Sequence, residues 1–338
     1  MFTAQELGAH GAAPRVGPLS FAGAAILAPM SGISDLGMRR SARRFGAALA
    51  FSEMVASAEF VAEDSEARLR AEGEGAEPHA AQLVGSEPAA MAEAARRLEA
   101  SGARLIDINL GCPSRRVAGR AAGCALMRDL DQATRLIEAV ARAVAAPVSV
   151  KMRLGWDDDE RNAPTLARRA EAAGAAMITV HGRTRRQLYD GNADWRAVGE
   201  VVAAVGVPVV VNGDCRGADD ARAMLAQSGA CGVMIGRAAL GAPWLVGAIG
   251  RALVAGGPAE DPPAAERREA ALSHVEWLLA ALGRRAGLRH ARKHLAAYSE
   301  KAGAPESLRR ALVTSEDADE ALRLLALAFA PQPQREAA

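Results

Sequence analysis

One cysteine stands where a catalytic thiol could act. Cys112 directly follows the apolar segment 105–110 and lies in a Gly-Cys-Pro turn. An unperturbed thiol has a pKa of about 8.5, so at neutral pH it is mostly protonated and can act as a general acid. A nucleophilic role would instead need a thiolate with a lowered pKa. The alternative is a small buried apolar residue, an interpretation that suits the other three cysteines better.

The segment after this thiol, 114–123, is rich in Gly, Ala and Arg and poor in residues that pack. We expect a mobile lid that becomes ordered over a substrate. A flexible connection without a function of its own is the alternative.

Polar residues also stand at the ends of other apolar runs. The mixture suits a planar ligand rich in heteroatoms, although polar residues could simply mark where strands leave the core. Two of the ends, 212–217 and 235–241, are Gly-rich turns that open helices, where backbone N–H groups attract phosphate. Tight turns required by the fold are the alternative there. The ends carry Pro29, Met30, Ser31, Glu53, Gln82, Asn109, Lys151, Arg153, His181, Asn212, Gly213, Asp214, Gly236 and Arg237.

The elements that must position these residues repeat along the chain. Short apolar runs alternate with longer stretches of helical period, which is typical of parallel strands covered on both faces. Eight such units predict a closed (β/α)8 TIM barrel, with a doubly wound sheet as the alternative. In such barrels the chemistry collects at the C-terminal ends of the strands. The predicted strands are 24–28, 48–52, 79–84, 104–109, 147–152, 176–181, 208–213 and 232–236.

A change in composition near 256–269 separates the barrel from a C-terminal helical bundle. We expect domains at 18–250 and 258–330. Residues 284–310 carry a net charge of +6 within a chain whose total is +1. Arg289, Arg292 and Lys293 have the spacing of one helix face, which can track nucleic-acid phosphates or can be an ordinary solvated face.

Other features of the 338-residue chain exclude several classes of protein. The four cysteines form no CxxC pair, so we expect no metal site and no disulfide framework, as in a reducing cytosol. The N-terminal residues lack the pattern of a signal peptide. No apolar run reaches the roughly 20 residues of a membrane span. We expect a cytoplasmic monomer.

Several motifs together resemble the tRNA-dihydrouridine synthase family, and most closely its bacterial B-type, or nitrogen-regulation-like, branch. The resemblance covers roughly residues 18–330. The most specific motifs are NLGCP at the predicted thiol and VHGRT at the sixth strand. The motifs are APMSGISD, AAQLVGSEP, IDINLGCPSRRV, VSVKMRLGW, ITVHGRTRRQLYDGNADW, PVVVNGDC, VMIGRAALGAPW and, in the tail, RKHLAAYSEKAGAPESLRRAL.

This resemblance implies an enzyme that reduces uridine to 5,6-dihydrouridine in tRNA, with FMN that is re-reduced by NADPH. Hydride would reach C6, and the Cys112 thiol would protonate C5. Lys151 would stabilise negative charge on the reduced flavin, with a simple salt bridge as the alternative. The implied flavin contacts are Pro29, Met30, Ser31, Gln82, Lys151, His181, Asn212, Gly213, Asp214, Gly236 and Arg237. The expected substrate contacts are Asn109, Arg153, Arg183, Arg289, Arg292 and Lys293.

Two other functions stay open at this point. The first is a flavin-dependent dehydrogenase of a free pyrimidine or small enone on the same barrel. The second is an RNA-binding module that has lost its flavin. The sequence does not choose a tRNA position, and the target base must leave its stack to reach a barrel mouth.

Overall fold

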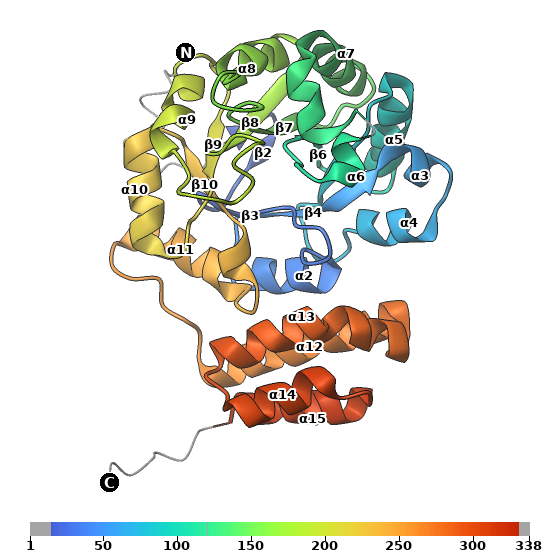
Figure 1. Ribbon diagram of the computed structural model, residues 1–338, viewed down its shortest axis with the longest axis vertical. Helices are drawn as coiled ribbons and strands as arrows, with labels where there is room; N and C mark the ends of the chain where they lie inside the picture. The colour runs from blue at the N-terminus through green and yellow to red at the C-terminus, as the bar shows by residue number, and fades with distance from the viewer. Residues whose placement is uncertain (1–14, 120, 331–338) are drawn as a thin grey trace.

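The computed structural model describes residues 15–119 and 121–330, and it forms a closed barrel of parallel strands with a layer of helices beneath it (Figure 1). All eight predicted strands are present, and the barrel closes where the last strand pairs with the first. The predicted TIM barrel is therefore confirmed, and the doubly wound sheet is excluded. The barrel strands are β3 Ala25–Leu27, β4 Leu49–Ala56, β5 Ala80–Val84, β6 Leu105–Leu110, β7 Val148–Arg153, β8 Ala175–His181, β9 Val209–Asn212 and β10 Gly232–Ile235.

Helices cover the outside of this barrel, because continuous apolar strands need partners on both faces. Pro stands at the start of α5 and α8, where its missing N–H costs no hydrogen bond. The outer helices are α2 Leu36–Arg44, α3 Ser57–Val61, α4 Ser65–Ala71, α5 Pro88–Ala100, α7 Leu130–Ala141, α8 Ala163–Ala172, α9 Trp195–Val202, α10 Ala218–Ser228 and α11 Trp244–Ala255.

The register of the strands brings the predicted polar residues to one end of the barrel. Asn109 of β6 lies beside Lys151 of β7, and His181 of β8 lies beside Asn212 of β9. Gln82 of β5 lies beside Asp107 of β6, which is two residues before Asn109. Residues from segments far apart in sequence thus form one ring at the C-terminal ends of the strands.

A short antiparallel hairpin, β1 Arg15–Val16 and β2 Leu19–Ser20, precedes the barrel. Val16 and the nearby Phe21 are buried with the apolar residues that point into the barrel, among them Ile26, Phe51 and Met234. This hairpin was not predicted, because two-residue strands show no period. The predicted absence of a signal peptide concerns residues that lie mostly outside the described part of the chain.

Four helices follow the barrel, in agreement with the predicted helical bundle. They pack on the side of α2 and α11, and one apolar cluster joins the two parts of the chain. Phe45 and Trp244 of the barrel contribute to this cluster together with Tyr298 of the bundle. None of the helices in the described residues is long and apolar enough to cross a membrane. The bundle helices are α12 Ala264–Leu282, α13 Arg284–Lys301, α14 Glu306–Thr314 and α15 Ala318–Ala328.

Candidate active site

The candidate thiol is held at the mouth of the barrel by the strand that precedes it. Asn109 is the residue before the last of β6, and its Oδ1 accepts hydrogen bonds from the backbone N–H of Gly111 at 3.1 Å and of Cys112 at 2.9 Å. The turn after the strand is therefore fixed by a side chain of the strand itself. The thiol is only half-buried. Burial is nevertheless enough to raise the pKa of Cys112, so the thiol stays protonated at neutral pH.

Asn109 is itself anchored by a chain of hydrogen bonds that leads into the barrel. Its Nδ2 donates to Gln82 Oε1 at 2.8 Å, and Gln82 Nε2 donates to Asp107 Oδ2 at 2.6 Å. Ser149 Oγ donates to the other oxygen of Asp107 at 2.6 Å. Burial raises the pKa of Asp107 to about 6. The chain of contacts fixes which way both amides face, so the acceptor oxygen of Asn109 points at the turn that carries Cys112.

Sequence reasoning missed Asp107, although the signal was present. Asp107 and Asn109 alternate with Ile106 and Ile108 in β6, so both polar side chains point to the inside of the barrel. A charged residue inside an apolar strand indicates a buried partner, because an unpaired charge would be costly there.

The ammonium of Lys151 belongs to the same ring of polar residues at the barrel mouth. Its Nζ donates to Asn212 Oδ1 at 3.1 Å, and Asn212 Nδ2 donates to the carbonyl of Met234 at 2.8 Å. The asparagine contact is the ammonium's one hydrogen bond among the described residues, so further N–H donors are available to a ligand. Burial and the charge of Arg153 lower the pKa of Lys151 to about 8, against the opposing effect of Asp107.

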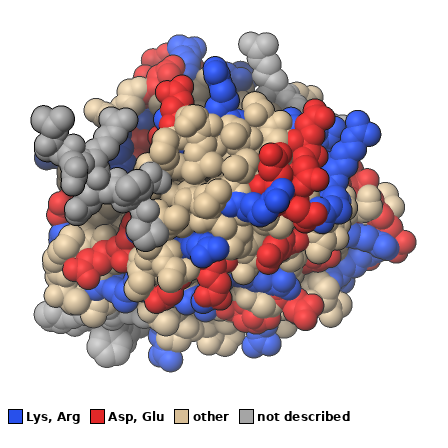
Figure 2. Space-filling model, turned by 90° about the horizontal axis from the view of Figure 1, so that it is seen from below, with Lys and Arg blue, Asp and Glu red and all other residues tan. Residues whose placement is uncertain are grey.

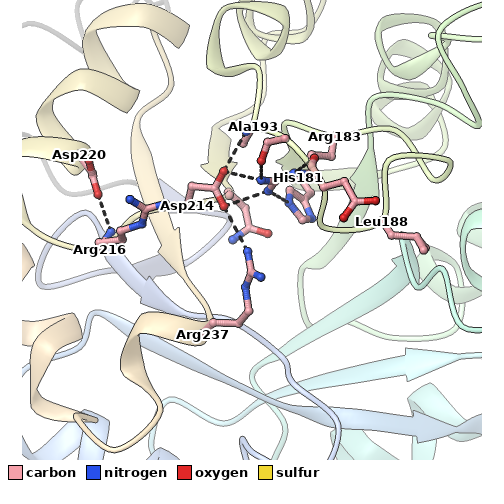
Figure 3. A network of polar contacts seen from close by, with 12 residues as sticks. His181, Arg183, Leu188, Ala193, Asp214, Arg216, Asp220 and Arg237 are labelled. Atoms are coloured by element: carbon pink, nitrogen blue, oxygen red, sulfur yellow. Dashed lines mark hydrogen bonds and ion pairs between the residues drawn. The ribbon is translucent and has the colours of Figure 1, made fainter. Parts of the chain in front are cut away.

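Four residues from three strand ends form a network at the neighbouring rim (Figure 3). Asp214 accepts from Arg183 at 2.6 and 3.0 Å and from Arg237 at 3.2 Å. Arg183 also donates to the carbonyls of the loop after β8. Burial and the surrounding cations hold the pKa of His181 well below its usual value, so this ring is neutral.

The turn that presents Asp214 requires glycine at position 213. Gly213 has a φ of +123°, and a Cβ there would lie 2.7 Å from Ala193 and 3.0 Å from the His181 ring. Asp214 follows with a φ of +59°. Gly236 has room by comparison, since a Cβ there would meet nothing closer than Met30 Sδ at 3.7 Å. Helix α10 begins at residue 218 with Gly217 as its N-cap, so the first Gly-rich turn leads directly into a helix, as predicted.

Two of the expected substrate contacts occupy positions that sequence reasoning did not foresee. Arg153 is 2% exposed and Arg183 is 1% exposed. Arg153 donates to the carbonyls of Gly111, Thr184 and Leu188, each at 2.9 Å. Both guanidinium groups therefore hold loops in place, and a direct contact of either with a substrate stays a prediction.

Tyr189 is a candidate that sequence reasoning missed. Its side chain is 54% exposed on the loop after β8. The guanidinium of Arg237 lies 4.8 Å from its ring centroid and that of Arg153 lies 5.7 Å away. The ring is thus held by cation–π contacts at the rim of the site, although a tyrosine in a loop gave no periodic signal.

Comparisons with known proteins show the family of this chain. The model of the dihydrouridine synthase family matches residues 26–332. The chain belongs to the dihydrouridine synthase family. It is 50% identical over 315 residues to a probable tRNA-dihydrouridine synthase of Rhodobacter capsulatus, covering 93% of this chain and 96% of that protein. It is 44% identical over 271 residues to the tRNA-dihydrouridine synthase B of Xanthomonas axonopodis, covering 80% and 81%. The resemblance seen in the sequence is confirmed.

Solved structures support the fold of this dihydrouridine synthase family member. Histamine dehydrogenase from Rhizobium matches with a TM-score of 0.54 at 14% identity, over 74% of this chain and 49% of that one. The 6-hydroxypseudooxynicotine amine oxidase of Pseudomonas geniculata matches with a TM-score of 0.55 at 12% identity, over 75% and 51%. At these identities both similarities show the fold alone.

The remaining predicted residues of this family member lie around the same mouth. Pro29 and Met30 are half-buried in the loop after β3, and Ser31 is exposed there. The expected lid, 114–123, contains a short helix, α6 Arg115–Ala118, and a 3-10 turn, η1 Gly123–Arg128, begins at its last residue. A second 3-10 turn, η2 Arg237–Ala239, follows β10. The two cofactor contacts expected at 29 and 30 thus share the upper rim with the thiol.

The three basic residues predicted to share one face of α13, Arg289, Arg292 and Lys293, differ in exposure. Arg289 and Arg292 are exposed, whereas Lys293 is half-buried and faces the barrel. A Cβ on Gly32 would lie 2.7 Å from Lys293 Nζ, and the charge of Glu53 acts on the same ammonium. Lys and Arg alternate with Asp and Glu over the face on the side of α14 and α15 (Figure 2). The three residues therefore do not form one exposed surface, and their contact with substrate stays a prediction.

Proposed function

We propose that this chain is a tRNA-dihydrouridine synthase that reduces the C5–C6 double bond of uridine, with Cys112 as the proton donor to C5. The observation that carries the proposal is the placement of this thiol. It is half-buried at a barrel mouth, protonated at neutral pH, and fixed through its backbone by Asn109. Membership of the family supplies the substrate class.

No side chain donates hydride, so the reaction needs a cofactor. The residues at the mouth fit FMN, because Lys151 and neutral His181 offer donors to the heteroatoms of a flavin ring. Arg237, whose side chain is 61% exposed, is available to its phosphate. When bound, FMN would supply the hydride for C6, and NADPH would restore it.

The residues of this chain have separate tasks in the proposal. Lys151 would supply a positive charge to the part of the flavin ring that becomes electron-rich on reduction. Asn109 fixes the backbone of the turn that carries the thiol, and it would contact the uracil. The exposed cations of α13 would contact the tRNA backbone, and we place this activity in a monomeric cytoplasmic enzyme.

Replacement of the thiol tests the proton donor. Cys112→Ala should keep the yellow colour of bound flavin but reduce turnover on tRNA by about 10²- to 10⁴-fold, the usual contribution of a general acid. Cys231→Ala is a matched control, since this thiol donates to the Val209 carbonyl at 3.2 Å, near the opposite end of β9. Reduction of tRNA at the normal rate by Cys112→Ala would refute the assignment. Reduction of free uridine in the absence of tRNA would favour a small-substrate dehydrogenase.

A further inference from the structure

A second group of polar residues lies outside the active site, at the junction of barrel and bundle. Asp35 follows β3 and caps the N-terminus of α2, where its Oδ1 accepts from the N–H of Met38 at 3.0 Å. His290 and His294 are four residues apart on α13, so they lie on the same face of that helix. One ligand atom from each of these three residues lies within 4.8 Å of the others.

The histidines of this group have ring nitrogens without partners. His294 is 0% exposed, and both of its ring nitrogens lack a hydrogen bond in the described structure. Its Nε2 lies 3.3 Å from Asp35 Oδ2, a separation that becomes an ion pair if the ring is protonated. His290 Nε2 is buried and lacks a partner as well. Buried polar atoms are nearly always paired, so two histidines with unpaired ring nitrogens beside one carboxylate call for an explanation.

The carboxylate of Asp35 is oriented by a further histidine, His274. His274 of α12 has its Nε2 at 2.9 Å from Asp35 Oδ1, and its Nδ1 lies 2.9 Å from the Tyr298 hydroxyl. If the hydroxyl donates to Nδ1, the proton of His274 lies on Nε2 and points at Asp35. Metal-binding carboxylates are typically supported by such outer hydrogen bonds.

We propose that Asp35, His290 and His294 bind one divalent cation of the zinc type, with water as the fourth ligand. Two imidazoles and a carboxylate are a ligand set that zinc accepts. Ligand atoms around tetrahedral zinc lie about 3.3 Å apart. The pair formed by Asp35 and His294 has this separation, and the most distant pair must close by about 1.5 Å. The ion ties the barrel to the bundle, because its ligands come from both.

The surroundings set the conditions for binding. Burial lowers the pKa of His294 to about 4, so the ring is neutral and its lone pair is free at neutral pH. Burial lowers the pKa of His290, and the charges of Lys293 and Arg70 lower it further; both cations also oppose a further positive charge. His290 is only half-buried, which gives an ion a path from solvent.

Direct binding of zinc to the full-length protein tests the site without reference to enzymatic activity. Wild-type protein freed of metal with a chelator should bind one zinc ion per chain in a calorimetric titration. His290→Leu should weaken this binding at least tenfold, because it removes a ligand and fills the half-buried position. Glu300→Gln is a matched control that changes an exposed residue of the same helix, and its affinity for zinc should equal that of wild type.

Melting temperature gives a second measurement. Zinc should raise the melting temperature of wild type and of Glu300→Gln, and should leave that of His290→Leu unchanged. Equal melting temperatures of all three chelated proteins would show that the substitutions leave the fold intact. The proposal is overturned if wild type binds no zinc, or if His290→Leu binds it as tightly as wild type. Either result would make the group a purely structural polar contact between barrel and bundle.

Discussion

At the scale of single residues, the structure separates two groups that could limit the reaction at high pH. Burial keeps the Cys112 thiol protonated, since it raises a pKa that is already about 8.5 in model thiols. The pKa of Lys151 shifts the other way: burial and the neighbouring guanidinium of Arg153 both lower it, to about 8. The ammonium therefore loses its proton before the thiol does. It is charged below pH 8 and neutral above it.

Turnover should accordingly decline as the pH rises through about 8, because Lys151 can stabilise negative charge in a bound ligand only while protonated. Lys151→Arg should shift this decline to higher pH, since a guanidinium keeps its proton throughout the range. Lys151→Met should be slow at every pH and show no decline near 8. Rates measured at saturating tRNA between pH 6 and about 9.5 check this. If Lys151→Met still showed the decline near pH 8, the decline would belong to the titration of another group.

At the scale of elements, the close approach of α11 to the barrel depends on one glycine. A Cβ on Gly247 would lie 1.9 Å from the carbonyl oxygen of Phe45 and 2.9 Å from the backbone of Gly46. Both are backbone atoms that cannot rotate away. Gly250 lies on the same helix, and a Cβ there would meet only Ala25 at an ordinary 3.5 Å. The two positions look alike in sequence but differ in what faces them.

Alanine at these two positions should therefore have opposite effects on stability. Gly247→Ala should lower the free energy of unfolding by about 2 kcal/mol or more, because the helix must move away from α2. Gly250→Ala should raise it by up to about 1 kcal/mol through better helix propensity. Urea unfolding of both variants beside wild type measures the difference. Equal stabilities would mean that α11 shifts outward without cost.

The sequence predicted those elements whose residues are dictated by burial. The barrel strands are mostly apolar runs, because both of their faces are covered, and such runs are readable from one sequence. The hairpin β1–β2 and the short helix α6 were not predicted, since they are too short to show a period. What decides their conformation is contact with segments distant in the chain.

The candidate site was predictable to the extent that strand ends converge. The register places Gln82, Asn109, Lys151 and Asn212 around one mouth, as eight parallel strands require. The direction of long side chains was not predictable. Arg153 stands at a strand end like the others, yet its guanidinium turns back onto backbone carbonyls that only the folded loops supply.

At the scale of the whole molecule, the bundle is fixed to the barrel by more than apolar contact. Trp244 of α11 packs on the Tyr298 ring with centroids 6.3 Å apart, and the buried His274 lies within hydrogen-bonding distance of Asp35 across the junction. Lys293 reaches from α13 to the loop after β3. The helices are thus held in one orientation relative to the mouth. A tRNA bound by the exposed residues of α13 would accordingly meet the site in a defined position.

This arrangement predicts how tRNA binding responds to salt. Arg289 and Arg292 are exposed on α13, so the double variant Arg289→Ala, Arg292→Ala should weaken tRNA binding and lower the slope of log affinity against log salt by about 2. The matched control is Arg142→Ala, Arg168→Ala, which removes two exposed charges from the outer surface of the barrel. Its slope should equal that of wild type. The same loss of slope in both double variants would indicate that overall charge attracts tRNA. A loss confined to the α13 variant would identify that helix as the contact, because counterions are released only where phosphates are neutralised.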